Sequence, residues 1–351
     1  MDSLEVARVK IMHILPELQI GGVERHVIDV ANAQAERGHG VTVISNGGQM
    51  ESQLSPSVKR VHLPVHKKNP FTALYSARKA AALAAREGTE IVHAHSRVPA
   101  FIAMLASRRA GIPYVVTAHS IFGTQTRWIY APYRAADAVI CVSKAVQDGM
   151  KNCFYDNTRV ILNGFAQPER HWNPSNRSAN RLLFVGRLSN VKGLQDVLKA
   201  LPVEMSWTLD VVGDGPQRAE WEKIAQERGI SDRVVFHGYR DDVERFMAEA
   251  SCLLFPSYTE GMPLTLAQAI LVGLPALASD IRPVAEMKGD KIGLLPPGDI
   301  AAWKNALTDL LNGDLTPPEF PLSAVPTMAS MVDGILKTYS DCISARNAIE
   351  R

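Results

Sequence analysis

Strand patterns and helix patterns alternate along this chain, and the alternation runs through it twice. Strands separated by helices pair in parallel, with helices on both faces of the sheet. The second series begins with a strand pattern at 182–185 and ends with one at 275–278. The apolar runs of the first series predict strands at residues 9–15, 41–44, 91–95, 114–117 and 138–142, with helices after Gly22 and over 98–110. The fold class is therefore α/β.

A polar segment separates the two series. Residues 166–180 contain prolines, arginines and asparagines without an apolar period, as is typical of a linker. The chain of 351 residues is long enough for two hydrophobic cores. We therefore expect two Rossmann-like domains, over residues 1–165 and 166–327. A last amphipathic helix is predicted over 328–346, after a proline-containing stretch.

Composition indicates a cytoplasmic protein. The four cysteines are too far apart in the sequence for a disulfide framework or a zinc site, which fits a reducing compartment. Asp2 and Glu5 precede the first apolar run, which argues against a signal peptide. Residues 261–279 are uncharged, but Gly273 and Pro275 interrupt them. This segment predicts a buried helix followed by a buried strand rather than a membrane span.

Positive charge is concentrated in the first half of the chain. Residues 1–165 contain 19 Lys and Arg against 12 Asp and Glu, whereas residues 166–351 contain 19 against 24. A basic half suits a phosphorylated substrate or an anionic membrane surface, and the candidate membrane contacts are Lys67, Lys68, Arg108 and Arg109. The alternative is an uneven charge distribution without a partner. Nucleic acid is not expected, because neither zinc-finger spacing nor a basic stretch interleaved with aromatic residues occurs.

Glycine-rich turns that carry cations follow several predicted strands. Gly186-Arg187 and Lys192-Gly193 combine close backbone approach with two positive charges, which suits a diphosphate. Gly213-Asp214-Gly215 and Gly21-Gly22 are weaker candidates, since neither has the G-x-G-x-x-G spacing of a dinucleotide site. In the alternative interpretation, Arg187 and Lys192 are solvated surface residues.

Three further side chains lie at predicted strand ends. His95, His119 and Glu260 each follow an apolar strand, and ligands of open α/β sheets bind beyond the carboxyl ends of the strands. Structural histidines and a helix-capping carboxylate are the alternatives. The sequence has no D-x-D, no G-x-S-x-G and no H-E-x-x-H. A metal-bound nucleotide and a serine nucleophile are therefore not indicated.

Taken in order, these motifs resemble the retaining glycosyltransferases of family 4, which have the GT-B fold. The resemblance implies two Rossmann-like domains facing a central cleft, with the C-terminal segment 328–351 crossing back to the first domain. It implies transfer of a sugar from a nucleotide sugar, expected to be a UDP-sugar, to a glycan or lipid-linked saccharide in cell-surface polysaccharide or glycoconjugate biosynthesis. No metal or other cofactor is expected. The matching segments are 21–25, 92–95, 116–119, 160–164, 186–193, 213–216, 236–239 and 255–261.

The resemblance also implies roles for single residues. Arg187 and Lys192 would hold the donor diphosphate, Glu260 the donor sugar, and His119 the transferred sugar near its reacting face. His95, Ser96 and Arg97 would lie on the acceptor side. The donor-binding residues would be Gly21, Gly22, Gly186, Arg187, Lys192, Gly213, Tyr239, Arg240, Glu260, Gly261, Met262, Pro263, Leu264 and Gln268. The cysteine usage and the basic first half, rather than the resemblance, lead us to expect a cytoplasmic enzyme that is peripheral on the cytoplasmic face of the membrane.

One residue departs from the family pattern. The second glutamate of the family's E-x7-E signature falls at position 268, where this chain has Gln268. An amide oxygen can accept hydrogen bonds from the ribose, but without charge assistance. Two alternatives therefore stay open: a non-catalytic or weakened homologue that binds sugar nucleotides, and a sugar-nucleotide epimerase of the same architecture. A nicotinamide oxidoreductase is disfavoured because the phosphate fingerprint is wrong.

Overall fold

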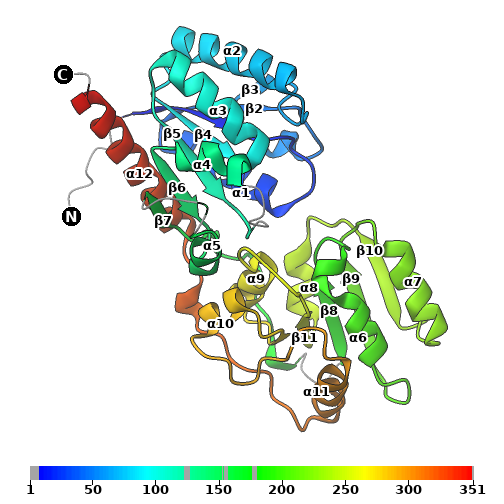
Figure 1. Cartoon of the computed structure of the whole chain (residues 1–351). Helices are drawn as coiled ribbons and strands as arrows, with labels where there is room; N and C mark the ends of the chain where they lie inside the picture. The colour runs from blue at the N-terminus through cyan, green and yellow to red at the C-terminus, as the bar shows by residue number, and fades with distance from the viewer. Residues whose placement is uncertain (1–7, 122–126, 152, 154–156, 176–179, 350–351) are drawn as a thin grey trace. The chain divides into compact units, whose positions relative to one another are not determined.

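The computed structural model describes residues 8–121, 127–151, 153, 157–175 and 180–349. The chain divides into two compact units (Figure 1). Unit 1 comprises Met1–Gly164 and Met328–Arg351, and unit 2 comprises Phe165–Thr327. Each unit is built on a parallel sheet covered by helices, so the α/β prediction is confirmed.

Unit 1 contains a seven-stranded sheet in the order β3-β2-β1-β4-β5-β6-β7. Its strands are β1 Lys10–Ile14, β2 Gly40–Ser45, β3 Lys59–His62, β4 Ile91–His95, β5 Tyr114–Ala118, β6 Ala138–Cys141 and β7 Thr158–Val160. Its helices are α1 Gly22–Glu36, α2 Pro70–Glu87, α3 Arg97–Ala110, α4 Ala131–Arg134, α5 Lys144–Gly149 and α12 Met328–Ile349. Every residue of β4 and β5 is buried, as expected for strands with helices on both faces.

The last helix, α12, belongs to unit 1. Its apolar residues Val332, Ile335 and Tyr339 pack with strand residues such as Ile11 and Val115 in one buried cluster (Figure 1). The amide of Gly164 also donates a hydrogen bond of 3.1 Å to Sδ of Met331. The C-terminal helix thus returns to the first domain, as expected.

Unit 2 contains a five-stranded parallel sheet in the order β10-β9-β8-β11-β12. Successive residues of its central strand, Leu182 and Leu183, belong to separate apolar clusters on the two faces. The strands are β8 Arg181–Val185, β9 Thr208–Val212, β10 Val234–Gly238, β11 Cys252–Phe255 and β12 Ala276–Ala278. The helices are α6 Leu194–Ala200, α7 Arg218–Glu227, α8 Val243–Glu249, α9 Leu264–Val272, α10 Arg282–Lys288 and α11 Ile300–Asn312.

The uncharged segment 261–279 forms α9 and β12 inside unit 2, which confirms the prediction of a buried helix and strand. None of the helices that the structure describes is both long and apolar enough to span a membrane. All four cysteines are buried and unpaired with one another. The sequence pattern did not predict seven of the helices and strands that the structure describes: β3, β7, α2, α4, α5, α10 and α11.

The segment expected as a linker is partly packed. Trp172 donates hydrogen bonds of 2.8 Å from its backbone amide to Val272 and from its indole nitrogen to the carbonyl of Ala250. Its ring packs against the apolar cluster under α9. Residues 166–175 therefore belong to unit 2 rather than forming a free connection, because the indole ring buries apolar surface against this cluster. Residues 176–179 lie outside the described part of the chain.

Candidate functional site

Three loops meet at the carboxyl ends of the strands in unit 2, and glycines allow them to touch. A Cβ atom at Gly213, after β9, would lie 2.0 Å from the carbonyl oxygen of Gly186, after β8. A Cβ atom at Gly193 would lie 2.0 Å from the carbonyl oxygen of Pro256, after β11. Gly193 and Gly213 also have positive φ angles of 69° and 134°. Only glycine fits at these two positions, so the close packing of the loops depends on them.

Two of the predicted catalytic residues lie together between these loops. Lys192 Nζ and Glu260 Oε1 form an ion pair of 2.6 Å, and their side chains are 22% and 12% exposed. The hydroxyl of Ser257 donates a second hydrogen bond of 2.7 Å to the same carboxylate oxygen. The ammonium group has three donors, so it can bind an anion while it remains paired with Glu260. The ion pair between Lys192 and Glu260 thereby links the loop after β8 to the loop after β11.

Arg187 supplies a second positive charge in the loop that carries Lys192. It follows Gly186, which lies against the aliphatic part of the Lys192 side chain. The side chain of Arg187 is exposed and makes no ion pair or hydrogen bond with the described residues. A cation without an internal partner, beside a lysine and close to glycine-rich backbone, suits binding of a phosphate group.

The remaining predicted donor residues of this loop lead into α9. Gly261, Met262 and Pro263 are buried, and the helix begins at Leu264. Gln268 lies one helical turn further on and is half-buried. The dipole of α9 places partial positive charge at its start, the same end as Glu260.

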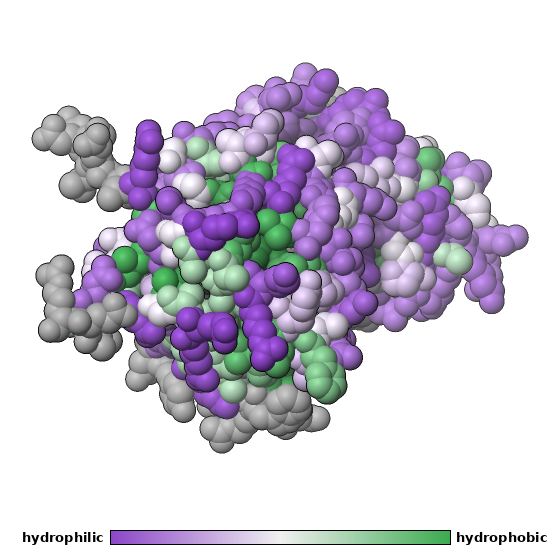
Figure 2. Space-filling view, turned by 90° about the horizontal axis from the view of Figure 1, so that it is seen from above, coloured by the Kyte–Doolittle hydropathy of each residue, from purple (hydrophilic) through white to green (hydrophobic). Residues whose placement is uncertain are grey.

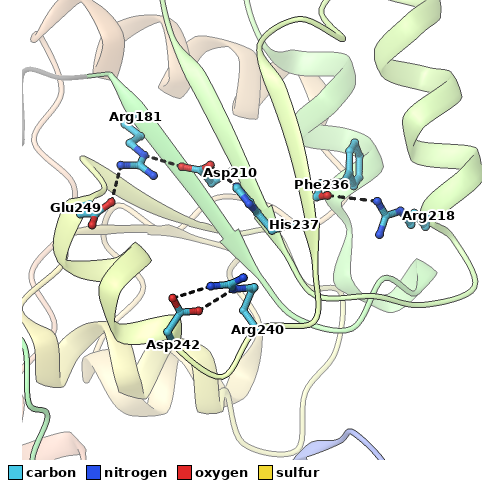
Figure 3. A network of polar contacts seen from close by, with 8 residues as sticks. All are labelled: Arg181, Asp210, Arg218, Phe236, His237, Arg240, Asp242 and Glu249. Carbon is cyan, nitrogen blue, oxygen red and sulfur yellow. Dashed lines mark hydrogen bonds and ion pairs between the residues drawn. The ribbon is translucent and has the colours of Figure 1, made fainter.

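Two more of the predicted donor-binding residues follow β10. Tyr239 is exposed, and Arg240 forms a bidentate ion pair with Asp242 at 2.8 and 2.9 Å (Figure 3). Just before them, His237 Nε2 lies 2.6 Å from Oδ1 of the buried Asp210. The other carboxylate oxygen of Asp210 accepts a bond of 2.6 Å from Arg181. Asp210 thus fixes the end of β10, and Arg240 is already satisfied by its neighbour.

In unit 1, Gly21 and Gly22 lie where predicted, at the start of α1. Gly21 is the N-cap and Gly22 the first residue of this 15-residue helix. The φ angle of Gly21 is 179°, which any residue adopts, so backbone strain does not require glycine here. A Cβ atom at Gly21 would instead contact the carboxylate of Glu24. The helix start offers a positive dipole end for an anion.

His119 is the last ring of a hydrogen-bonded chain of histidines. His13 on β1 bonds to His95 on β4 through Nδ1 and Nε2 at 3.1 Å, and His95 Nδ1 lies 3.2 Å from His119 Nε2. At the inner end, His13 Nε2 lies 2.8 Å from the carbonyl oxygen of the Gln34 side chain. Since that oxygen only accepts, each ring carries its proton on Nε2. His119 therefore presents an unprotonated Nδ1, which can accept a hydrogen bond from a hydroxyl group.

A second branch of the network runs to α12. His93 Nδ1 lies 2.6 Å from the hydroxyl of Tyr339, and its Nε2 lies 2.7 Å from the hydroxyl of Thr117. His26 packs edge-on against His119 with 5.0 Å between ring centroids. The rings meet because His13, His93 and Thr117 occupy one face of adjacent strands.

All five rings are neutral at physiological pH. Burial lowers the pKa of His13 and of His26 from 6.5 to about 4, and the hydrogen bond that Gln34 accepts from His13 opposes this shift only in part. Burial, followed by repulsion among the rings, also lowers the pKa values of His93, His95 and His119 well below 6.5. Two triplets, His13 with His93 and His95, and His26 with His95 and His119, have nitrogens within 4.8 Å of one another, close enough to share a metal ion. The hydrogen bonds already account for the arrangement of the rings His13, His95 and His119.

The acceptor-side prediction needs a correction at His95. Its ring is fully buried in unit 1 and bonded on both nitrogens, so it acts on any ligand only through His119, which is partly exposed. Ser96 follows directly, with a φ of 85° that is unusual for a residue other than glycine. Such strain is common at functional sites. Arg97 begins α3 and is exposed.

Sequence reasoning missed several residues of this arrangement: His13, His26, Gln34, His93, Ser257, Asp210 and Tyr339. The concentration of eight of the ten histidines in the first half was the available signal. Their contacts depend on strand order and could not be assigned from spacing alone.

Comparison with known proteins decides the family. The family model "Glycosyltransferase Family 4" matches residues 20–166, and "Glycosyl transferases group 1" matches residues 179–313. This chain belongs to the family 4 glycosyltransferases. The two matches cover parts of both units and leave out residues 1–19, 167–178 and 314–351, the last of which include α12.

Relatives with assigned names agree with this family. The O-antigen chain mannosyltransferase C of Escherichia coli is 25% identical over 367 aligned positions, covering 93% of this chain and 96% of its own length. The N-acetyl-alpha-D-glucosaminyl L-malate synthase of Bacillus anthracis is 25% identical over 327, covering 84% of this chain and 86% of its own.

Solved structures confirm the GT-B fold. HepE of Anabaena, crystallised with UDP, matches with a TM-score of 0.71 at 20% identity, covering 97% of this chain and 98% of that one. Sucrose-phosphate synthase of Thermosynechococcus elongatus matches with a TM-score of 0.74 at 20% identity, covering 98% of both chains. This family 4 glycosyltransferase thus has two Rossmann-like domains of the expected type.

Proposed function

We propose that this glycosyltransferase moves a sugar from a UDP-sugar to a glycan or lipid-linked saccharide, with retention of configuration and without a metal ion. The observation that carries the proposal is the cluster of Arg187, Lys192 and Glu260 at the carboxyl ends of β8 and β11. Two cations and one carboxylate beside glycine-rich backbone suit a diphosphate bonded to a sugar. Enzymes of the same family supply the expectation of retention.

In the proposed reaction, the acceptor hydroxyl attacks the anomeric carbon from the face that the diphosphate leaves. The bond from the anomeric carbon to the phosphate oxygen breaks as the new glycosidic bond forms, and that phosphate oxygen takes the hydroxyl proton. Arg187 and Lys192 stabilise the charge that develops on the departing UDP. Glu260 orients the sugar hydroxyls, and Nδ1 of His119 accepts a hydrogen bond from the transferred sugar. Positioning and charge stabilisation supply the catalysis, and no protein nucleophile is needed.

The choice of donor and acceptor rests on related proteins. HepE was crystallised with UDP and, in a further structure, with UDP-glucose. The Escherichia coli relative is named for the O-antigen chain, a polysaccharide. We also place the reaction in the cytoplasm, because the four cysteines are free, as is usual in a reducing compartment.

A transfer assay tests the proposal. The protein is incubated with UDP-, GDP-, ADP- and dTDP-sugars and a panel of saccharide and lipid-linked acceptors, with and without EDTA. NMR of the product reports the anomeric configuration. We expect a glycoside of retained configuration from a UDP-sugar, at the same rate in EDTA. An inverted product or loss of activity in EDTA would contradict the mechanism, and conversion of the donor sugar without any acceptor would indicate an epimerase.

Gln268 favours one alternative function, a protein that binds sugar nucleotides without transferring the sugar. An amide at this position binds ribose hydroxyls without charge assistance. The variant Gln268→Glu separates the two functions. If the wild-type protein binds a UDP-sugar but transfers it only after this substitution, the non-catalytic interpretation holds.

A further inference from the structure

Helix α2 presents one side to unit 1 and another to solvent. Its buried residues, such as Ala77, Ala80 and Ala84, face the unit, where α2 packs alongside α3. On the opposite side, exposed residues recur at helical spacing. We call the exposed residues that begin this helix and its preceding loop the α2 face: Lys67, Lys68, Phe71, Leu74, Tyr75, Arg78 and Lys79.

The first turn of α2 exposes large apolar side chains next to one another. Phe71 is 81% exposed, Tyr75 is 50% exposed and Leu74 is 40% exposed. Single exposed apolar residues are ordinary on soluble proteins, but three neighbours on one helical turn form a contiguous patch. Figure 2 views the molecule from the side on which α2 lies in Figure 1, and shows hydrophobic residues among strongly hydrophilic ones on this face.

Positive charge surrounds this patch on both sides along the chain. Lys67 and Lys68 precede it, Arg78 and Lys79 follow it, and none of the four pairs with a carboxylate of the described residues. Residues 52–86 contain seven Lys and Arg and no Asp or Glu. Lys79 lies over the ring of Tyr75, 5.8 Å from its centroid. An exposed helix with aromatic residues flanked by cations that lack a carboxylate partner is typical of proteins that lie on the surface of anionic bilayers.

We propose that the α2 face docks on an anionic lipid bilayer. Phe71, Leu74 and Tyr75 enter the interface, and the lysine and arginine side chains reach the lipid phosphates. Leu74 favours lipid over single-stranded nucleic acid, because an aliphatic side chain offers no ring on which a base could stack. Arg108 and Arg109 end α3 at the opposite edge of the sheet from the first turn of α2, so these two expected contacts lie outside the docking face.

The place of the α2 face in the fold connects docking to catalysis. Helix α2 follows β3, so its first turn lies at the carboxyl edge of the sheet, the same edge as Gly22 and His119. A bilayer bound there would lie on the side of unit 1 where a lipid-linked acceptor must reach the transferred sugar. This connection depends on the proposed function, whereas vesicle binding can be measured without any turnover.

Sedimentation with vesicles tests the proposal. The full-length protein is mixed with vesicles of phosphatidylcholine alone or of phosphatidylcholine with phosphatidylglycerol, at low and high salt. We expect binding to the anionic vesicles only, and weaker binding at high salt. Phe71→Ser and Tyr75→Ser should each weaken vesicle binding about tenfold, and the double variant Lys67→Glu/Lys68→Glu at least tenfold.

Matched variants of unit 2 serve as controls. Ile292 is 78% exposed, and Lys199 and Lys304 are exposed lysines. Ile292→Ser and the double variant Lys199→Glu/Lys304→Glu should bind vesicles as the wild type does. Since all the substituted side chains are exposed, thermal unfolding should confirm that every variant folds. The proposal is overturned if anionic vesicles are not bound, if the α2 variants and the controls bind equally, or if the serine variants keep full affinity, which would indicate charge attraction alone.

Discussion

At the scale of single residues, charge without a partner distinguishes the site. Lys192 and Glu260 neutralise each other at 2.6 Å. Arg187 stands beside them with no partner among the described residues, so it keeps its full charge for a ligand. Buried or paired arginines elsewhere, such as Arg181 with Asp210, hold the sheet together instead.

Substitution of Arg187 should therefore affect catalysis without affecting folding. We expect Arg187→Ala to lower kcat/KM about 10- to 100-fold, the effect of one lost charge-assisted phosphate contact. Arg187→Lys should retain part of the activity, because the charge remains while the bidentate geometry is lost. Lys223→Ala, at an exposed lysine of α7, is the control and should behave as wild type. Full activity of Arg187→Ala in steady-state kinetics would remove this residue from the site.

At the scale of elements, glycines set how closely the loops approach. Gly213 has a positive φ, and its missing Cβ leaves room for the carbonyl of Gly186. Gly273, at the end of α9, also has a positive φ, but a Cβ there would meet nothing within 4 Å. Substitutions at Gly273 and Gly213 can therefore be compared to separate two contributions to the free energy of unfolding, the strained backbone conformation and the contact between loops.

We expect Gly273→Ala to lower the free energy of unfolding by about 1 kcal/mol, from the left-handed conformation alone. Gly213→Ala should cost roughly 2–4 kcal/mol, because the added methyl group must also displace the loop that carries Arg187. Denaturant unfolding measures both. Donor affinity should fall only in the Gly213 variant, and equal effects of the two substitutions on binding would show that the loop contact is unimportant.

Five neighbouring histidines, His13, His26, His93, His95 and His119, make the stability of unit 1 depend on pH. The five rings are neutral when folded, with pKa values lowered by burial, whereas in the unfolded chain they take the ordinary value of 6.5. Between pH 6.5 and about 4 the unfolded chain therefore binds more protons, so stability falls as the pH drops through this range. Each histidine that is charged only in the unfolded chain contributes about 1.4 kcal/mol per pH unit.

Thermal unfolding at a series of pH values checks this expectation. The melting temperature should fall steadily between pH 6.5 and 5, and the slope should become smaller in His26→Asn. A melting temperature that is constant over this range would show that the rings are not buried as neutral groups.

The difference between local and distant contacts also explains what the sequence could predict. Apolar runs and glycine turns are local signals, so the two sheets, α9 with β12, and the positions of Gly186 and Lys192 could be predicted. The contact of His93 with Tyr339 joins residues 246 positions apart, and that of His13 with His95 joins residues 82 apart. Such pairs form only once strand order and the return of α12 are known. The prediction of a linker was wrong at Trp172. Its neighbours in the sequence are polar, so the sequence pattern did not indicate that its ring packs against the apolar cluster of unit 2.

At the scale of the whole molecule, each unit brings its own chemistry. Unit 2 presents the cations and the carboxylate proposed to hold the donor. Unit 1 presents an unprotonated nitrogen of His119 at the carboxyl edge of its sheet and a basic, aromatic α2 face at the same edge. The central claim is that the cluster around Arg187 binds the diphosphate of a UDP-sugar.

Calorimetric titration of the full-length protein with UDP and UDP-glucose tests that claim most directly, using the wild type, Arg187→Ala and Lys223→Ala in the presence of EDTA. We predict saturable binding to the wild type and to Lys223→Ala, and binding at least tenfold weaker, about 1.4 kcal/mol, in Arg187→Ala. Absence of binding to the wild type, or equal affinity in all three proteins, would contradict the account.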